Sequence, residues 1–539
     1  TQTKCHHFFF PMSYGVEKSP DGNSNSLFHL AREKKGQIAM EVVVMVLSLC
    51  VLFLLMKFLY STLIVPRIIQ RHFNKQGISG PKYRFLFGNS GDIQRLHAES
   101  QSGTTSFNHD VLHKMIPHFA KWSADHGANF LYWFGCTPRL VVSDPQMVKE
   151  VLTNASGSIT KVDFSPLVKS LTGEGVATLD GDKWAKRRRI VNQGFTSECI
   201  KNWMPEIVGS AAEMVEKWDK MRRDGDEFEV DMHREFNKLS ADIIAKTAFG
   251  SSYEKGKMIF ELQEESMLLV SKIVKSLYLP GFRFLPTKDN RERERLNKET
   301  CNLIKKLIIE ESGIEGKETR KNLLSILMAS HGDETLNEGE IIDECKGFYF
   351  AGKETAASAM TWSILLLALH QEWQEKAREE VLRVLGREPI SAEKLKELKI
   401  VHMILNESLR LYPIVTTLTR KTTRKMKLGE LDIPAGTQFD LPLAAIQRNV
   451  ELWGPDANEF NPARFYEPRK HLAAFMPFGM GPRICVGQHL YVFEWKIVLA
   501  TIIRDYSFRV SPTYVHSPRI FISLEPKHGA QVLFSKILP

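Results

Sequence analysis

The ten residues from Phe478 to Gly487 constrain this chain more than any other stretch, reading Phe-Gly-Met-Gly-Pro-Arg-Ile-Cys-Val-Gly. Gly481, Arg483 and Cys485 complete a pattern of fixed spacing around one cysteine. A thiolate at Cys485 is able to ligate a haem iron and to push electron density toward it, which favours cleavage of the O–O bond of dioxygen. The segment therefore predicts a haem–thiolate site, and the fold must provide a pocket for a flat macrocycle beside it.

The neighbours of Cys485 fit this prediction. Gly481 and Gly487 let the backbone approach the macrocycle where a Cβ atom would clash, and Arg483 is positioned to neutralise a haem propionate. The apolar run after Gly487 predicts a helix, and the partial positive charge at its N-terminus would lower the pKa of the Cys485 thiol. The alternative is a glycine-rich loop that carries a buried free cysteine.

A second constraint is the apolar run Val42–Val65, in which Lys57 is the one ionised side chain. Its 24 residues are enough to cross a bilayer as a helix. A cleaved signal peptide would have a shorter apolar core and a small-residue cleavage site, so a buried core helix is the remaining alternative. Basic residues lie on both sides of the run, and the positive-inside rule does not fix its orientation.

These features divide the chain into four parts. We expect residues 1–39 to be disordered or translated from upstream, because Met40 stands where an anchored protein would begin; with that start, the bulk of the chain faces the cytosol. Residues 40–65 form the transmembrane anchor, and 66–81 form a Pro/Gly hinge in which Pro66 breaks regular structure. Residues 82–539 form one large catalytic domain, because no linker or repeat divides them.

Composition narrows the environment. Net charge is +9 without a nucleic-acid-binding motif, which favours an acidic protein partner or an anionic membrane over nucleic acid. The seven cysteines are scattered without a Cys-x-x-Cys pair, which is typical of a reducing compartment and argues against zinc.

The fold class predicted is mainly α with a minor β region. Leu131–Phe134 and Leu140–Val142 are expected to form a hairpin bridged by a turn containing Thr137-Pro138, with another strand near 435–439. Asn337 and Glu340 form a predicted capping box, from which one helix runs to about Leu369.

The middle of that long helix reads Ala351-Gly352-Lys353-Glu354-Thr355. The small residues leave space for a cofactor and for dioxygen. Because oxygen activation consumes protons, Glu354 and Thr355 are predicted to relay them as catalytic residues. The alternative is a Thr355 hydroxyl that only bonds back to the helix carbonyls.

Other pairs complete the site. Trp184 and Arg188 share a helix face and, with Arg420, are predicted to bind the propionates, while the rest of the basic run 186–189 is a solvated face. Glu407, Arg410 and Arg464 are predicted to form a buried structural network. The same Glu-x-x-Arg spacing begins at Glu292, Glu375 and Glu380, where we expect solvated pairs.

These landmarks, in this order, resemble the cytochrome P450 superfamily of haem–thiolate monooxygenases from about residue 76 onward. Gln76-Gly77-Ile78-x-Gly80-Pro81-x-Tyr83 and Ser511-Pro512-x-Tyr514-x-His516-x-Pro518 are similar to the plant clan of brassinosteroid-inactivating hydroxylases, cytokinin hydroxylases and secologanin synthase. The resemblance implies the cytochrome P450 fold, haem b with Cys485 as axial ligand, and a single-pass endoplasmic-reticulum protein. Its electrons would come from NADPH through a flavin-containing cytochrome P450 reductase, with cytochrome b5 as a further candidate partner.

The predicted reaction inserts one atom of O₂ into a C–H bond of an apolar small molecule. A haem–thiolate isomerase or dehydratase of oxygenated lipids and a non-catalytic haem sensor remain the alternatives. The substrate is not fixed by the sequence, although the clan favours a steroid- or terpenoid-like compound. By family analogy the pocket lining comprises Phe348, Ala351, Val415, Thr416, Thr417 and Leu418.

Overall fold

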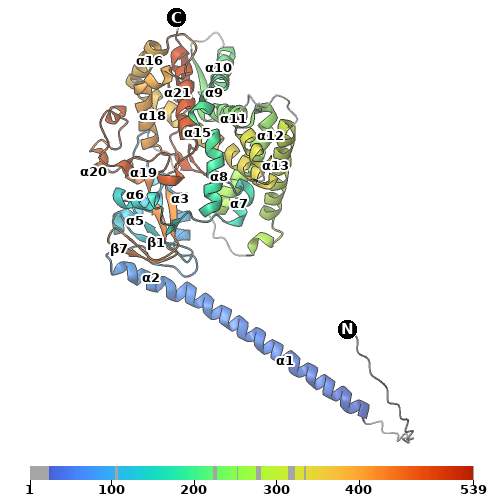
Figure 1. Ribbon diagram of the computed structural model, residues 1–539. Helices are drawn as coiled ribbons and strands as arrows, with labels where there is room; N and C mark the ends of the chain where they lie inside the picture. The colour runs from blue at the N-terminus through green and yellow to red at the C-terminus, as the bar shows by residue number, and fades with distance from the viewer. Residues whose placement is uncertain are drawn as a thin grey trace, which may run out of the picture. The chain divides into compact units, whose positions relative to one another are not determined.

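The computed structural model describes residues 24–102, 107–221, 227–251, 253–274, 281–312, 322–332 and 335–537. They separate into two compact units between Val65 and Pro66 (Figure 1). Residues 24–39 are helical, contrary to the expected disorder; the earlier part of the predicted extension, residues 1–23, lies outside the described residues.

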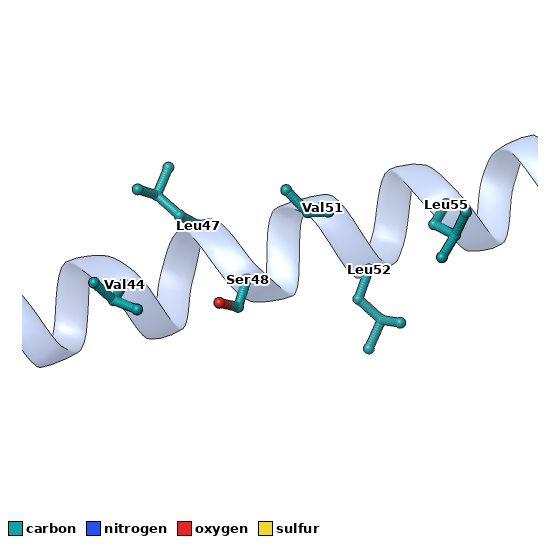
Figure 2. Close-up of a pocket in the computed structure, with 6 residues that line it drawn as sticks. All are labelled: Val44, Leu47, Ser48, Val51, Leu52 and Leu55. Atoms are coloured by element: carbon teal, nitrogen blue, oxygen red, sulfur yellow. The ribbon is translucent and has the colours of Figure 1, made fainter.

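The first unit contains α1 (Ser24–Leu59) and the π-helical turn η1 (Tyr60–Ile64). Helix Arg32–Asn74 contains an 18-residue window of mean hydropathy 2.8, none of which is buried. Figure 2 shows that the side chains of Val44, Leu47 and Leu52 leave the helix on different sides. A helix that is apolar all round suits a lipid environment, which supports the predicted anchor.

Pro66 lies inside α2 (Val65–Asn74), so it does not interrupt the helical structure as predicted. Proline lacks the N–H that bonds to the preceding turn, and its ring crowds the carbonyl four residues back. The wider π-helical turn η1 comes immediately before it, which is a recognised way for a helix to absorb such a local disturbance.

The predicted hinge after α2 is attached to the second unit rather than free. The side-chain amide of Gln76 accepts from the backbone N–H of Asp432 (2.7 Å) and donates to its carbonyl (3.2 Å). A Cβ at Gly80 would lie 1.7 Å from the carbonyl oxygen of Leu131, so only glycine permits this approach. This segment therefore docks against the catalytic domain.

The minor β region includes a five-stranded sheet of order β1-β2-β8-β5-β3. Phe134 pairs with Thr137, so the hairpin turns at Gly135 and Cys136, and Thr137-Pro138 belong to a strand instead of the predicted turn. The strands are β1 (Leu131–Phe134), β2 (Thr137–Val141), β3 (Ile159–Thr160), β4 (Glu227–Asp231), β5 (Leu418–Thr422), β6 (Met426–Leu428), β7 (Leu431–Ile433), β8 (Gln438–Leu441), β9 (Tyr506–Val510), β10 (Pro518–Ile520), β11 (Leu524–Pro526) and β12 (Gln531–Lys536).

Helices make up most of the second unit, as predicted. The α-helices after α2 are α3 (Ser90–Ser100), α4 (Leu112–Met115), α5 (Pro117–His126), α6 (Pro145–Thr153), α7 (Pro166–Thr172), α8 (Gly181–Gly194), α9 (Ser197–Asn202), α10 (Met204–Met221), α11 (Met232–Phe249), α12 (Tyr253–Val274), α13 (Lys288–Ser312), α14 (Leu323–Gly332), α15 (Glu338–Leu369), α16 (Gln371–Leu385), α17 (Lys394–Glu397), α18 (Lys399–Leu411), α19 (Leu443–Ile446), α20 (Val450–Trp453) and α21 (Gln488–Asp505). Short helices are η2 (Phe282–Phe284), η4 (Pro462–Phe465), η5 (Leu472–Ala474) and η6 (Gly481–Arg483).

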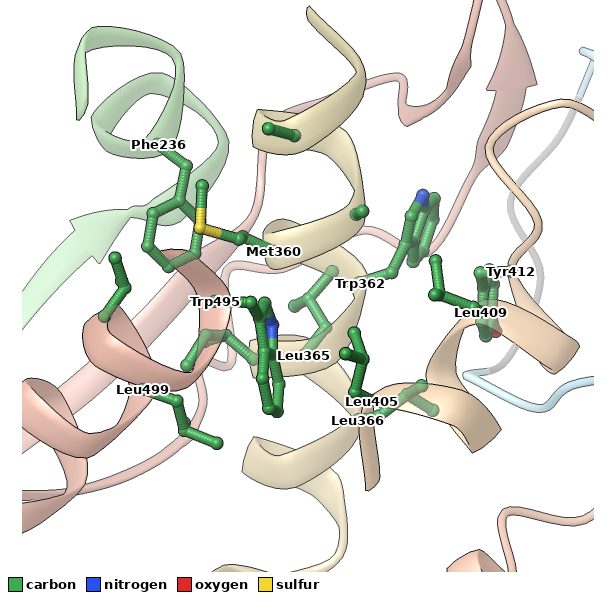
Figure 3. Close-up of a cluster of buried hydrophobic side chains, with 14 of the residues drawn as sticks. Phe236, Met360, Trp362, Leu365, Leu366, Leu405, Leu409, Tyr412, Trp495 and Leu499 are labelled. Atoms are coloured by element: carbon green, nitrogen blue, oxygen red, sulfur yellow. The ribbon is translucent and has the colours of Figure 1, made fainter. Parts of the chain in front are cut away.

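Helix α15 is the centre of the core. Both hydrogen bonds of the predicted capping box between Asn337 and Glu340 are present, and the helix ends at Leu369 as predicted. Figure 3 shows α15 surrounded by side chains of α11, α18 and α21. The indole ring of Trp362 stacks on Tyr412 with 4.2 Å between ring centroids, which fixes α15 against the end of α18.

Candidate haem–thiolate site

The loop before α21 holds Cys485 as the sequence predicts. Its backbone N–H donates to the carbonyl of Phe478 (2.9 Å), and α21 begins at Gln488. The pKa of the Cys485 thiol is raised overall, because the effect of burial outweighs that of the hydrogen bonds from the Gly487 and Gln488 backbone, which lower it. The nearby Arg188 guanidinium also lowers the pKa. These donors and the positive charge favour a thiolate but, contrary to the prediction from the sequence, they do not bring the pKa of Cys485 below its ordinary value.

Gly481 and Gly487 of the loop differ in how closely other atoms approach them. Gly481 has a φ of +75°, and a Cβ there would lie 2.3 Å from the carbonyl oxygen of Leu152. It therefore admits a backbone contact with α6, a reason that does not involve a cofactor. A Cβ at Gly487 would meet the Sγ of Cys485 at 3.9 Å, which places this residue directly beside the thiol.

Arg483 joins the loop to the start of α8. Its guanidinium donates to the carbonyl of Leu179 (2.9 Å), forms an ion pair with Asp180, and lies 4.4 Å from the centroid of the Trp184 ring. Arg483 and Trp184, both predicted to bind propionates, are thus in direct contact.

Further cations gather at the same place. Arg420, which donates to the carbonyl of Thr419 (2.9 Å), has its pKa lowered to about 10 by burial and by the charge of Arg483. Lys161, which the sequence analysis missed, has its pKa lowered to about 8 by burial and by Arg483 and Arg420. The pKa of Arg188 is lowered by burial and by Arg483.

The charge of this cluster fits a dianionic cofactor. Lys161, Arg188, Arg420 and Arg483 carry four positive charges, and Asp180 is the carboxylate that counters them in the interactions above. Burial and the repulsion of neighbouring cations lower the pKa values of Lys161, Arg188 and Arg420, and added carboxylates would relieve the repulsion. A haem with two propionates would supply that charge, and Cys485 would supply the iron ligand.

The basic run on α8 does not form one solvated face as predicted. Arg187 is buried and donates to the carbonyl of Glu340 (3.1 Å) and to the carboxylates of Glu340 (2.7 Å) and Glu344 (3.2 Å). Lys186 and Arg189 are exposed as expected. Successive helix residues point about 100° apart, so Arg187 turns inward toward α15 beside the half-buried Arg188.

The middle of α15 is open where the sequence predicts space. Ala351 is exposed, and the Thr355 hydroxyl donates to its carbonyl at 2.6 Å, so the alternative role foreseen for this hydroxyl is present. Gly352 serves another purpose, because a Cβ there would lie 2.5 Å from Cγ1 of Ile244. It allows α11 to cross closely and does not provide space for a cofactor.

Core packing brings the thiol loop and α15 together. Val486, next to Cys485, packs against a hydrophobic cluster that contains Val191 of α8 and Phe348 of α15. Phe348 is 6% exposed and stacks on Phe195, 5.6 Å away between ring centroids. Its ring is covered mainly by protein, and its role as a pocket-lining residue stays a prediction.

The other predicted lining residues differ in exposure. Val415 is 43% exposed and Ala351 is exposed, so both have surface to offer a ligand. Thr417 and Leu418 are half-buried, whereas Thr416 is buried with its carbonyl accepting from the backbone N–H of Ala444.

The predicted structural network is present and buried. Glu407 and Arg410 are 0% exposed, and the guanidinium of Arg410 binds both carboxylate oxygens of Glu407, at 2.6 and 2.8 Å. Arg464 donates to Glu407 at 2.9 Å and pairs with Asp456 at 2.9 Å.

The other Glu-x-x-Arg pairs are not all solvated. The Glu292–Arg295 pair is 38% and 42% exposed, as expected. Glu375 binds Arg378, which is buried against the carbonyl of Ile503. Glu380 is buried and accepts from three backbone N–H groups at the start of α18, so it caps a helix.

Known proteins that are similar to this chain point to the same family as its sequence motifs. The Cytochrome P450 family profile matches residues 106–533. "Cytochrome P450 734A1" of Arabidopsis thaliana is 41% identical over 486 residues, covering 88% of this chain and 92% of the relative. "Secologanin synthase 1" of Catharanthus roseus is 38% identical, covering 88% and 93%. Among solved structures, a retinoic acid-bound cyanobacterial CYP120A1 matches with a TM-score of 0.68 and 22% identity, covering 77% of this chain and 93% of that one.

Proposed function

The chain belongs to the cytochrome P450 family, and we propose that it inserts one oxygen atom into a C–H bond of an apolar small molecule, with electrons delivered from NADPH by a flavoprotein reductase. The observation that carries the proposal is the Cys485 thiol, positioned before α21 and close to Arg188 of the cation cluster. The family and fold imply haem held by a cysteine thiolate. When bound, the haem supplies the activation of dioxygen.

The chain's own residues would orient the cofactor and the protons. Cys485 would ligate the iron, while Arg188, Arg420, Arg483 and Trp184 would bind the propionates and so fix the plane of the ring. Lys161 joins this group because it shares their electrostatic surroundings. Phe478, Gly481 and Gly487 shape the loop that holds the thiol.

Proton delivery would involve the middle of α15. Glu354 would donate a proton and Thr355 would hold it for transfer toward the oxygen. The hydroxyl of Thr355 donates to the Ala351 carbonyl, and its oxygen keeps lone pairs that can accept a proton. We expect Thr355→Ala to retain haem and to uncouple NADPH consumption from product; unchanged coupling would count against the relay.

The substrate class proposed is a steroid- or terpenoid-like compound. One relative is named for the synthesis of secologanin, and the exposed apolar side chain of Val415 suits an apolar ligand. The alternative of an isomerase or dehydratase requires neither dioxygen nor a reductase. The alternative of a haem sensor requires no turnover. NADPH-dependent oxygenation of any substrate by this protein would exclude both alternatives.

The location proposed is the endoplasmic-reticulum membrane, with α1 as a single span and the catalytic domain in the cytosol. The apolar, unburied helix supports membrane attachment. A membrane-bound reductase would then meet the catalytic domain at the same surface, with cytochrome b5 as a further electron donor. Protease protection of a tag placed after Pro539 in microsomes would contradict the cytosolic orientation.

The decisive experiment is the carbon monoxide difference spectrum of the dithionite-reduced protein in membranes. A strongly red-shifted Soret band is expected from thiolate ligation, and Cys485→Ala should abolish it. Cys199→Ala is the matched control, because this cysteine is buried and lies outside the loop. An unshifted band in folded, haem-loaded wild-type protein would overturn the proposal.

A further inference from the structure

The segment of residues 173–180, which connects α7 to α8, lies against the N-terminal part of α15. A Cβ at Gly173 would lie 2.3 Å from the carbonyl oxygen of Asp343, and one at Gly175 would lie 2.7 Å from Oε2 of Glu344. Both glycines are buried, and Gly173 has a φ of +80°. They therefore permit a close contact between α15 and these eight residues, which we call the α7–α8 segment.

Glu344 holds the α7–α8 segment at this contact. Its side chain is 1% exposed, and its Oε1 accepts from the backbone N–H of Val176 (2.7 Å) and from the guanidinium of Arg187 on α8 (3.2 Å). Arg187 is also buried, whereas its second carboxylate partner, Glu340, is 41% exposed. One buried carboxylate oxygen thus joins α15, α8 and the segment between α7 and α8.

The same segment binds two residues of the cation cluster. The guanidinium of Arg483 donates to the carbonyl of Leu179 (2.9 Å) and forms an ion pair with Asp180. The ammonium group of Lys161 donates to the carbonyl of Ala177, and its backbone N–H donates to the Asp180 carboxylate (3.1 Å). The segment is therefore attached to α15 at one side and to the cations at the other.

A short turn connects these two sides of the segment. The backbone N–H groups of Thr178 (2.9 Å) and Leu179 (3.0 Å) both donate to the carbonyl of Gly175. The hydroxyl of Thr178 donates to the carbonyl of Gly173 (3.3 Å). Because these bonds fix the turn internally, a movement at the side attached to α15 also moves the side that binds the cations.

The Glu344 carboxyl titrates near neutral pH. Burial raises its pKa to about 7, against the opposing effects of the Arg187 charge and the hydrogen bond from Val176. A hydrogen bond to a charged acceptor is stronger than one to a neutral acceptor, so the ionised form binds both donors more strongly. The charged and titratable groups around this carboxyl are Arg187 on α8 and Asp343, Glu340 and Cys345 on α15.

We propose, building on the haem site proposed above, that Glu344 is a positioning residue whose ionised carboxylate fastens the α7–α8 segment and α8 to α15. The segment binds Lys161 and Arg483, and α8 carries Arg188. One carboxylate thereby holds three of the four cations in place for the propionates.

The first test is hydrogen–deuterium exchange of the full-length protein, measured by mass spectrometry on peptides that contain Val176. At pH 8, Glu344→Gln should exchange about tenfold faster than wild type, because the Val176 N–H then donates to a neutral acceptor. At pH 6 the wild-type carboxyl is mostly protonated, so the ratio of the two rates should approach one. Taking the ratio at each pH removes the intrinsic pH dependence of exchange.

The pH dependence separates positioning by charge from a merely structural role. A structural role gives the same ratio at both pH values; that outcome, or an unchanged rate at pH 8, would overturn the proposal. Glu340→Gln is the matched control, because it also removes a carboxylate partner of Arg187, but an exposed one in the first turn of α15. Its exchange at Val176 should match wild type, and glutamine still completes the capping box.

The second test connects the segment to the cofactor through a double-mutant cycle. At pH 8, Glu344→Gln should release haem to apomyoglobin faster than wild type by a factor of up to about ten, because the same charge-assisted bond is lost. If Glu344 acts through the cation cluster, combining it with Lys161→Met should give less than the product of the two single effects. A product of independent effects, or unchanged release in Glu344→Gln, would overturn the positioning role.

The two proposals fail separately. Exchange at Val176 does not depend on turnover, and retention of haem through its propionates does not require a thiolate. An unshifted carbon monoxide band would therefore overturn the monooxygenase proposal and leave both tests of Glu344 measurable. A red-shifted band with unchanged exchange would overturn only the role of Glu344. Circular dichroism of each variant establishes that its fold is retained.

Discussion

Removing the charge of Glu407 should lower the free energy of unfolding of this protein much more than removing the charge of an exposed glutamate. In Glu407→Gln the side chain keeps its volume but loses one acceptor oxygen. Its carboxylate oxygens now accept from Arg410 twice, from Arg464 (2.9 Å) and from the backbone N–H of Asn461 (2.8 Å). The amide group can satisfy only part of this set, and its NH₂ would face a guanidinium donor.

The magnitude follows from the burial of Arg410. Its guanidinium is 0% exposed, and after the substitution its other partners are the neutral carbonyls of Gln447, Ala457 and Glu459. Breaking a buried ion pair and leaving one charge without its counterion costs about 3–5 kcal/mol. Because folded domains have about 5–15 kcal/mol of stability, this loss is a large fraction of the whole.

The assay is urea unfolding of the full-length protein in detergent, followed by far-UV circular dichroism. The matched control is Glu292→Gln, which has the same Glu-x-x-Arg spacing but an exposed pair with Arg295. That pair should contribute little to stability, because solvent screens the attraction between exposed charges. Equal midpoint shifts for Glu407→Gln and Glu292→Gln would refute the reasoning, because burial would then have no bearing on the energy of the pair.

Three further predictions concern other parts of the domain. Gly352→Ala should lower the free energy of unfolding by about 1–3 kcal/mol, because the new methyl group overpacks against Ile244. Adding Ile244→Ala to the same chain should recover part of that loss. If urea unfolding shows the two losses to be additive, the packing argument is contradicted. Burial lowers the pKa of His109 and of His516 in the folded protein from 6.5 to about 3. The free energy of unfolding is therefore highest above pH 6.5, and it falls as the pH drops from 6.5 toward 3. At pH 5 the loss is about 2 kcal/mol per histidine, visible as a lower thermal midpoint; identical midpoints at pH 7 and 5 would refute it. Lys161→Met should release haem to apomyoglobin faster than wild type, because one cation near the propionates is lost; an unchanged rate would exclude Lys161 from the cluster's function.

The sequence predicts local features of this fold well. The Cys485 loop, the helix that follows it and the capping box at Asn337 are each specified by residues within a few positions of one another. The Glu407 network was also predictable, because the spacing from Arg410 and the later Arg464 are part of a family pattern.

Features that depend on distant contacts were not predictable from the residues alone. Arg187 and Arg188 are neighbours in sequence, and only the packing of α8 on Glu340 and Glu344 decides that Arg187 is buried. Lys161 has no motif around it, and its proximity to Arg483 arises from the fold.

The burial pattern of α15 argues independently for where the chemistry takes place. From Ile341 to Tyr349 and again from Ala356 to Ala368 most side chains are buried, as expected of a core helix. Between them, Ala351 is exposed and Glu354 and Thr355 are half-buried, although the helix itself is continuous. A core helix gains stability from burial at each turn, so a turn left open in its middle forgoes that gain. The open turn carries an acid and a hydroxyl, which supports the proposal that proton transfer takes place at this turn.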